Sequence, residues 1–149
     1  MIRHEVKAVN TAATKNAGDA GEWAWCAYCG EVRTAHDSKS YDKDSDCNAN
    51  GHGYSVKASG ASLMSGSLCE GLEDFEAIWN LYAARVHSDR FVYMTKSWTA
   101  YEMDLNEFGE FVHAFGYCER ESSKNGGKVK IRFRKESSKM VAWLESRAA

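Results

Sequence analysis

Helical spacing of apolar residues is clearest in the second half of the chain. Apolar positions recur every three or four residues over 72–86 and again over 105–115, which predicts two amphipathic helices. Asp104 and Glu107 have the spacing of a capping box at the start of the second helix. A further helix is expected to begin near Ser137.

Strand patterns lie between and after these helices. The apolar run at 90–95 is typical of a central strand, and the alternation at 99–105 favours a neighbouring strand. Residues 116–120 and 128–134 flank the turn signal Asn125-Gly126-Gly127, which predicts a hairpin.

The first part of the chain contains a predicted helix and two predicted strands. Residues 1–16 form a polar lead-in, and the nearly apolar stretch 22–29, followed by Gly30, predicts a buried helix with a glycine C-cap. A polar loop then leads into a strand near Asp46. A turn at Asn50-Gly51 is expected to connect it to a strand at 54–58.

This order of elements predicts one α/β domain over residues 1–149, with a mixed central sheet flanked by helices. The length is typical of one domain with a real core. Hydrophobic residues make up 44% and charged residues 27% of the chain, which fits a globular protein and excludes a disordered one.

Charge and targeting signals narrow the functional classes. The formal net charge is -2, so any nucleic-acid surface has to come from local patches. No apolar run is long enough to cross a membrane, and the N-terminus has no signal-peptide core, so we expect a cytoplasmic protein. Five cysteines do not suggest a disulfide framework.

Four polar residues have the spacing of a metal-dependent phosphodiesterase site. Glu22 lies on the first predicted helix, Asp46 at the start of one strand, and Ser55 and Lys57 on one face of the next strand. Carboxylates bind Mg²⁺ through oxygen, the metal activates water, and a lysine can orient or deprotonate that water. Asp42 and Asp44 are further carboxylates in the same acidic run.

The stretch AGDAGEWAW…SYDKDSDCNANGHGYSVKAS resembles the PD-(D/E)XK nuclease superfamily, which includes small type II restriction endonucleases and Holliday-junction resolvases. Glu22 matches the family's helix glutamate, Asp46 its aspartate, and Ser55-Val56-Lys57 its acid-x-Lys pair. Ser55 stands where the family has its second acid.

The resemblance implies a restriction-endonuclease-like core and a Mg²⁺-dependent or Mn²⁺-dependent endonuclease that acts on DNA. Asp46 and Glu22 would bind the metal and Lys57 would position or activate the water. Because such small domains cut both strands as twofold pairs, a homodimer is also implied.

A basic strand and a serine-rich segment are candidates for contact with DNA. Lys128, Lys130, Arg132 and Arg134 alternate with apolar residues, so they share one face of their strand and either face solvent or hold phosphates. Ser59 and Ser62 offer hydroxyl groups to a nucleic-acid backbone.

Three other interpretations remain open. The same fold without catalysis would be a nucleic-acid-binding or protein-binding module. Cys26 and Cys29 could begin a zinc site, with Cys47, His36 or His52 as further ligands. The Trp-Cys-x-x-Cys run also resembles thioredoxin-like redox sites, but no predicted strand precedes it.

Overall fold

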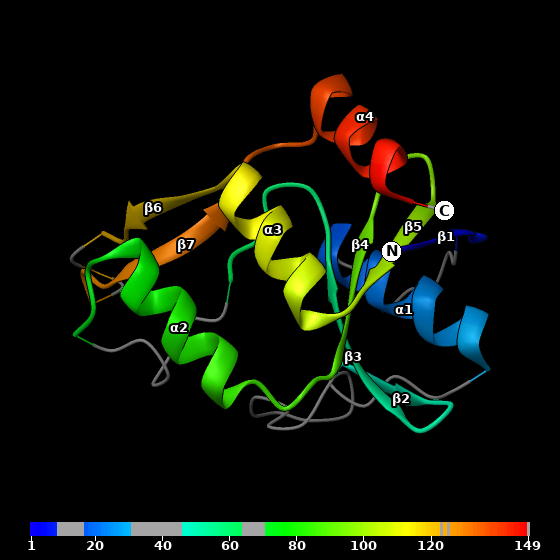
Figure 1. Cartoon of the computed structure of the whole chain (residues 1–149), viewed down its shortest axis with the longest axis horizontal. Helices are drawn as coiled ribbons and strands as arrows, with labels where there is room; N and C mark the ends of the chain where they lie inside the picture. The colour runs from blue at the N-terminus through cyan, green and yellow to red at the C-terminus, as the bar shows by residue number, and fades with distance from the viewer. Residues whose placement is uncertain (9–16, 31–45, 64–70, 123, 125, 149) are drawn as a thin grey trace.

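The chain folds into a mixed α/β structure, described here by a computed structural model (Figure 1). The structure describes residues 1–8, 17–30, 46–63, 71–122, 124 and 126–148. The elements in chain order are β1 (Ile2–Glu5), α1 (Ala17–Cys29), β2 (Cys47–Ala49), β3 (His52–Lys57), α2 (Phe75–Arg85), β4 (Arg90–Met94), β5 (Thr99–Met103), α3 (Leu105–Phe115), β6 (Gly116–Arg120), β7 (Val129–Phe133) and α4 (Ser138–Arg147).

The described strands form two sheets. The larger sheet has five strands in the order β1-β5-β4-β3-β2. Strands β3 and β4 pair in parallel and the other neighbours pair antiparallel. Strands β6 and β7 form a separate antiparallel hairpin, which lies beside α2 and α3 in Figure 1. The predicted mixed α/β class is therefore confirmed, with the C-terminal hairpin set apart from the main sheet.

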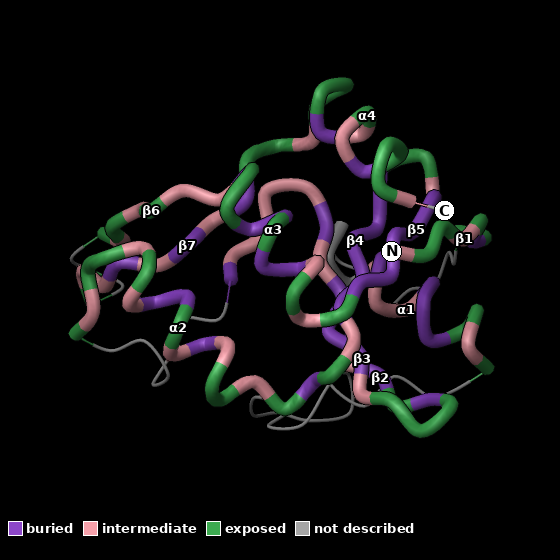
Figure 2. The backbone as a smooth tube through the Cα atoms, viewed as in Figure 1, coloured by how far each residue is buried: buried purple, intermediate pink, exposed green. Residues whose placement is uncertain are grey.

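Each face of the large sheet is covered by its own hydrophobic core, and Figure 2 shows β4 and β5 as largely buried strands, in purple. Alternate residues of β4 point to opposite faces, so Phe91 and Tyr93 join one core while Val92 and Met94 join the other. The first core also includes these buried side chains of α2, α3, β5, β7 and α4: Ile78, Tyr82, Tyr101, Met103, Phe108, Phe111, Ile131, Phe133, Met140 and Leu144. The second core packs α1 onto β2, β3 and β4 through Ala24, Trp25, Cys26, Cys47, Tyr54 and Val56.

Local signals in the sequence specify where the predicted helices begin. Asp104 and Glu107 form the expected capping box at the start of α3, and Ser137 caps α4 through a hydrogen bond from the Met140 amide. Helix α1 ends before Gly30, whose φ is +77°. A side chain disfavours that conformation, so glycine suits the position.

The turn predicted at Asn50-Gly51 connects β2 to β3. Both residues have positive φ, 54° and 78° respectively, as a two-residue type I′ hairpin requires. The β2–β3 register pairs Cys47 with Tyr54 and Ala49 with His52. This turn fixes which residues of β3 face which core.

The N-terminal prediction was wrong for residues 2–5. Residues 1–16 were expected to be a polar lead-in, yet Ile2–Glu5 forms β1 and pairs with β5 from Ile2↔Glu102 to Glu5↔Thr99. The strand lies at the edge of the sheet and is largely exposed, so its sequence carries no apolar alternation. Its strand conformation depends on pairing with residues almost one hundred positions away.

The segment after β3 is held against β7. The Leu63 amide donates to the Ile131 carbonyl oxygen at 2.7 Å, and the Phe133 amide donates to the Ala61 carbonyl oxygen at 2.8 Å. The sequence suggested a serine-rich segment for DNA contact here, and the described part of this segment, 59–63, joins the two sheets. No helix in the described part of the chain is both long and apolar enough to span a bilayer.

Candidate functional site

Asp46 lies directly before β2, at the edge of the large sheet. Its backbone amide donates to the Tyr54 carbonyl oxygen at 2.9 Å, and its Oδ2 accepts a hydrogen bond from the Val56 amide at 2.8 Å. The carboxylate therefore continues the hydrogen bonding of the sheet edge where the β2–β3 pairing ends. This contact fixes the carboxylate one residue away from Lys57.

Ser55 and Lys57 share one face of β3, as their spacing predicted. Their cross-strand partners on β4 are Phe91 and Tyr93, so both side chains lie on the side of the first core. Ser55 is only 8% exposed. Lys57 is half-buried, and its Nζ lies 3.4 Å from the carbonyl oxygen of Ser62. The serine hydroxyl is thus an interior group, whereas the ammonium lies at the end of the strand.

Glu22 approaches from the opposite face of the sheet. It is half-buried on α1, and its neighbours Ala24 and Trp25 belong to the second core. Cys26 follows Glu22 by one helical turn, so the two residues share a helix face. Because Cys26 is bonded to Cys47, beside Asp46, that helix face is turned toward the edge occupied by Asp46.

The structure thus brings the four residues to one end of the α1–β2–β3 unit, but from two faces. Asp46 is held at the edge, Glu22 comes from the α1 side, and Ser55 and Lys57 face the first core. Among the described residues, no group of three or more His, Cys, Asp or Glu is arranged to hold a metal ion. Asp42 and Asp44 lie outside the described residues.

The carboxylates of Asp46 and Glu22 are nevertheless chemically suited to bind a hard cation. Carboxylate oxygens are the ligands that Mg²⁺ prefers, and Mg²⁺ commonly takes one or two protein carboxylates and completes its shell with water and substrate phosphate. Asp46 and Glu22 could therefore hold Mg²⁺ or Mn²⁺ only together with such further oxygen ligands.

The phenol of Tyr93 belongs to the same end of the sheet. Its hydroxyl donates to Glu136 Oε1 at 3.2 Å, and Glu136 also accepts the Lys96 amide. Burial, reinforced by the Glu136 carboxylate, raises the pKa of Tyr93. The phenol therefore remains a hydrogen-bond donor, and it helps to fix the strand opposite Lys57.

Buried and exposed side chains alternate along the basic strand, as predicted, but two of its basic residues form ion pairs with glutamates. Val129, Ile131 and Phe133 are buried, while Lys130 and Arg132 between them are partly exposed. Lys130 pairs with Glu121 at 3.2 Å and Arg132 with Glu119 at 2.7 Å. Arg134 lies over the ring of Tyr117, 5.2 Å from its centroid. Lys128 lines an open hollow beside Gly127.

The two candidate serines stabilise the 59–63 segment. Ser59 Oγ accepts the Glu136 amide at 2.9 Å, and Ser62 forms a β-bridge with Arg132. Arg132 also donates to the Gly60 carbonyl oxygen at 2.9 Å. Lys57 reaches the carbonyl oxygen of Ser62 in the same segment, so this segment contacts both the candidate lysine and the basic strand.

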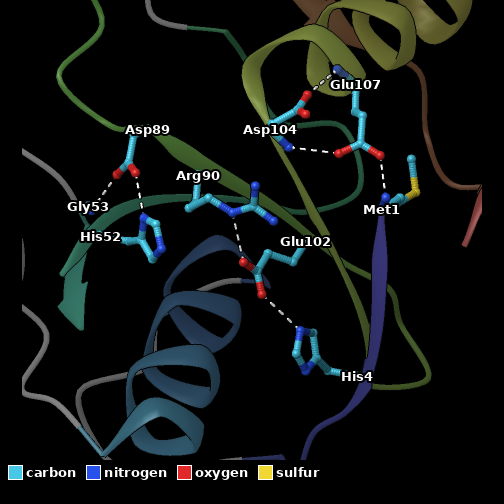
Figure 3. A network of polar contacts seen from close by, with 9 residues as sticks. All are labelled: Met1, His4, His52, Gly53, Asp89, Arg90, Glu102, Asp104 and Glu107. Carbon is cyan, nitrogen blue, oxygen red and sulfur yellow. Dashed lines mark hydrogen bonds and ion pairs between the residues drawn. The ribbon is translucent and has the colours of Figure 1, made fainter. Parts of the chain in front are cut away.

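Two polar networks were not predicted from the sequence (Figure 3). His52 Nδ1 lies 2.5 Å from Asp89 Oδ2, and Asp89 Oδ1 accepts the Gly53 amide at 2.7 Å. The second network places Glu102 between Arg90, at 2.8 Å, and His4, at 2.9 Å. These contacts join residues far apart in sequence, and nothing in their local patterns indicates the pairing.

The electrostatics of Asp89 follow from this geometry. Desolvation works to raise the pKa of Asp89, but the His52 ring and the Gly53 amide outweigh it, and the pKa lies below its ordinary value. The Asp89 amide also donates to the Gly53 carbonyl oxygen. Asp89 therefore connects the starts of the parallel strands β3 and β4.

The cysteines differ from what the sequence suggested. Cys26 and Cys47 form a disulfide between α1 and β2, with 5.8 Å between their Cα atoms, and Cys29 is not part of this bond. The disulfide removes Cys26 from the zinc-ligand pair with Cys29 that was one of the alternative interpretations. It also differs from a Cys-x-x-Cys bond of the thioredoxin-like kind.

No protein-family model, curated protein or solved structure matches this chain. What the chain does must therefore be inferred from its own side chains. The resemblance to the nuclease superfamily remains a prediction that activity measurements have to test.

Proposed function

We propose that the protein is a Mg²⁺-dependent endonuclease that hydrolyses DNA phosphodiester bonds. The observation that supports this most strongly is the Asp46 carboxylate, which is hydrogen-bonded to the backbone of β3 beside Lys57. An acid fixed at the edge of a strand that ends in a lysine is what metal-assisted phosphodiester hydrolysis needs.

Asp46 and Glu22 are the proposed metal ligands. When bound, the cation would neutralise charge on the scissile phosphate and make a coordinated water more acidic. Asp46 contributes a pre-positioned carboxylate, since its Oδ2 is already fixed by the Val56 amide. Glu22 contributes a second carboxylate from α1, whose position depends on how α1 packs against β2 and β3.

Lys57 is the proposed group that orients the attacking water and the phosphate. Its ammonium contacts one backbone carbonyl oxygen at 3.4 Å, which is a weak interaction by the usual distance criteria. A substrate phosphate would therefore compete for it easily. Ser55 stands in place of a second acid and offers only a neutral oxygen from a buried position.

The order of elements is compatible with the proposal. Helix α1 precedes the β2–β3 hairpin, and α2 follows before β4 pairs in parallel with β3. This is the order that the resemblance to the nuclease superfamily implies. The proposal includes a homodimer, because one such site can cut only one strand at a time.

DNA contact is proposed through the outer face of β7 and the 59–63 segment. Lys128, Lys130, Arg132 and Arg134 would meet phosphates along this path, with Ser59 and Ser62 between them and Lys57. Because Glu119 and Glu121 pair with two of these cations, we expect modest affinity that falls with salt.

A binding module without catalysis is the second candidate. The observation that favours it is the burial of Ser55, which is 8% exposed and replaces a carboxylate with a group that carries no charge. The same surface would then bind nucleic acid or protein without cutting it.

A plasmid-nicking assay tests the proposal. Wild-type protein is incubated with supercoiled, linear and branched DNA in Mg²⁺ or Mn²⁺, with EDTA as the blank. Asp46→Asn is the informative variant, since an amide oxygen can still accept from the Val56 amide while the charge is lost. Glu110→Gln, on the exposed side of α3, is the matched control.

We expect nicking by the wild type and by Glu110→Gln, and at least a 100-fold loss in Asp46→Asn, because losing a metal ligand costs at least as much as losing its outer-shell support. DNA binding without cleavage of any substrate would favour the binding module. Cleavage that persists in Asp46→Asn would place the active site elsewhere.

A further inference from the structure

One covalent bond connects the two elements that carry the proposed metal ligands. Cys26 lies on α1 and Cys47 begins β2, and their sulfur atoms form a disulfide. Both residues are buried, with exposed fractions of 1% and 0%. In the part of the chain that the structure describes, this is the covalent connection between the helix and the sheet edge.

The disulfide joins positions close in the chain to the two residues that carry the carboxylates. Cys47 directly follows Asp46, and the Cys26 sulfur is 3.8 Å from the Asp46 carbonyl oxygen. Glu22 precedes Cys26 by one helical turn on the same helix face. A shift of Cys26 relative to Cys47 would therefore change the separation of the two carboxylates.

We infer that the Cys26–Cys47 disulfide is a redox switch that acts on Glu22 and Asp46. In the oxidised protein the disulfide fixes the positions of the two carboxylates relative to each other, and reduction removes this constraint. This inference rests on the proposed function, because it names the regulation of the same site. It goes beyond it in assigning a role to two cysteines that the proposed chemistry does not use.

The chemistry of the switch is thiol–disulfide exchange with a dithiol reductant. Because the disulfide is buried, exchange requires a local opening of α1 from β2. A thiolate of the reductant then attacks one sulfur of the disulfide, the bond between the cysteines breaks, and the displaced cysteine leaves as a thiolate that takes up a proton. The second thiol of the reductant then attacks the mixed disulfide. The protein gains two electrons and two protons, and the reductant becomes a disulfide.

Because the core around the disulfide is densely packed, reduction should shift the residues of the proposed site. The two sulfurs share a dense core with Trp25, Tyr54 and Val56. Two thiols that are no longer bonded need more room than a disulfide, and a close-packed interior absorbs such a change by shifting its elements. Displacements of about 1 Å at a catalytic centre can cost about 100-fold in rate.

The first test establishes the bond. Trypsin, applied under non-reducing conditions to protein alkylated at its free thiols, should yield peptide 16–33 joined to peptide 44–57. The link should persist in Cys29→Ser and vanish in Cys26→Ser. Recovery of both peptides as alkylated monomers from protein purified without reductant would overturn the inference.

The second test measures the switch. Mn²⁺ affinity, followed by electron paramagnetic resonance, and the nicking rate are compared before reduction, after reduction by dithiothreitol, and after reoxidation. We expect reduction to weaken Mn²⁺ binding about 10-fold, as loss of outer-shell support does, and reoxidation to restore it. Cys118→Ser, an exposed cysteine on β6, is the matched control and should behave as wild type.

The outcomes separate the two proposals. Equal Mn²⁺ affinity and equal nicking in both redox states would overturn the switch and leave the endonuclease proposal intact. Reversible loss of Mn²⁺ binding without nicking in either state would support the switch and contradict the nuclease. Absence of Mn²⁺ binding in both states would overturn the switch.

Discussion

The Asp46 carboxylate serves the fold as well as the proposed chemistry. It accepts the Val56 amide at 2.8 Å, and Val56 is only 5% exposed. Asp46→Ala would leave this amide without its acceptor in a buried strand, which costs about 1–3 kcal/mol. Asp46→Asn retains an acceptor oxygen and should cost less.

Urea unfolding of the two variants measures this difference. We expect the free energy of unfolding to fall clearly in Asp46→Ala and only slightly in Asp46→Asn. Equal losses in both would show that charge, and not the hydrogen bond to Val56, determines the contribution of Asp46 to stability.

Asp89 should make the stability of the folded protein depend on pH. Its pKa is lower in the folded protein than in the unfolded chain, so its contribution is present above the unfolded pKa, near 3.8, and is lost as the pH falls through the folded pKa. Wild type should therefore exceed Asp89→Asn in stability at pH 7, and the gap should close toward pH 3.

This gap is measured by urea unfolding of both proteins at several pH values. A gap that stays constant, or that widens in acid, would contradict the role assigned to the Asp89 carboxylate in joining β3 to β4.

For single residues, the sequence correctly predicted those features that depend only on the spacing of side chains along one strand. The period of two along β3 correctly placed Ser55 and Lys57 on one face. It could not show that α1 covers the other face, because that depends on which core each side of the sheet builds. The pairing of Cys26 with Cys47 was missed for the same reason.

Helix α3 contains a glycine whose role is set by tertiary packing. A Cβ on Gly109 would lie 2.9 Å from Cζ2 of Trp79, and Trp79 is itself packed against Tyr82 and Phe108. Alanine normally stabilises a helix interior by about 1 kcal/mol over glycine. Here overpacking, which costs about 1–3 kcal/mol, should outweigh that gain.

Gly109→Ala should therefore lower the midpoint of thermal unfolding. Asn80→Ala, on the exposed side of α2, provides the contrast, since it gains helix propensity without a clash and should raise the midpoint slightly. Stabilisation of the protein by Gly109→Ala would contradict the packing described for α2 and α3.

Elements with local signals were predicted well, and those formed by distant pairing were not. The capping box of α3, the Ser137 cap of α4 and the Asn50-Gly51 turn can each be recognised within a few residues. Strand β1 has no such signal, because its four residues become a strand only through β5. The β6–β7 hairpin was predicted from its turn signal, but its separation from the main sheet has no local signal.

The charge balance of the whole molecule limits the proposed DNA surface. The chain carries a net charge of -2. Two of the four basic-strand residues form ion pairs: Lys130 with Glu121, directly after β6, and Arg132 with Glu119 on β6. The sequence showed the basic strand but not the acids that the hairpin register brings opposite it.

Releasing those two cations should strengthen DNA binding. In Glu119→Gln/Glu121→Gln we expect tighter binding at low salt, and a dependence of log K on log salt that is steeper by up to about 2, near one unit for each freed cation. Fluorescence anisotropy over a salt series measures both. Unchanged affinity and slope would show that this face does not meet phosphates.

The most direct test of the central claim is the single-turnover nicking rate of Lys57→Met in Mg²⁺. Methionine keeps most of the side-chain stem at the end of β3 and removes only the ammonium, and Lys139→Met, on the exposed side of α4, controls for the loss of one positive charge. We expect Lys57→Met to fall by about 100-fold or more, as loss of a group that assists proton transfer does, with Lys139→Met near the wild-type rate. A Lys57→Met protein that nicks DNA as fast as the wild type would contradict the proposed site.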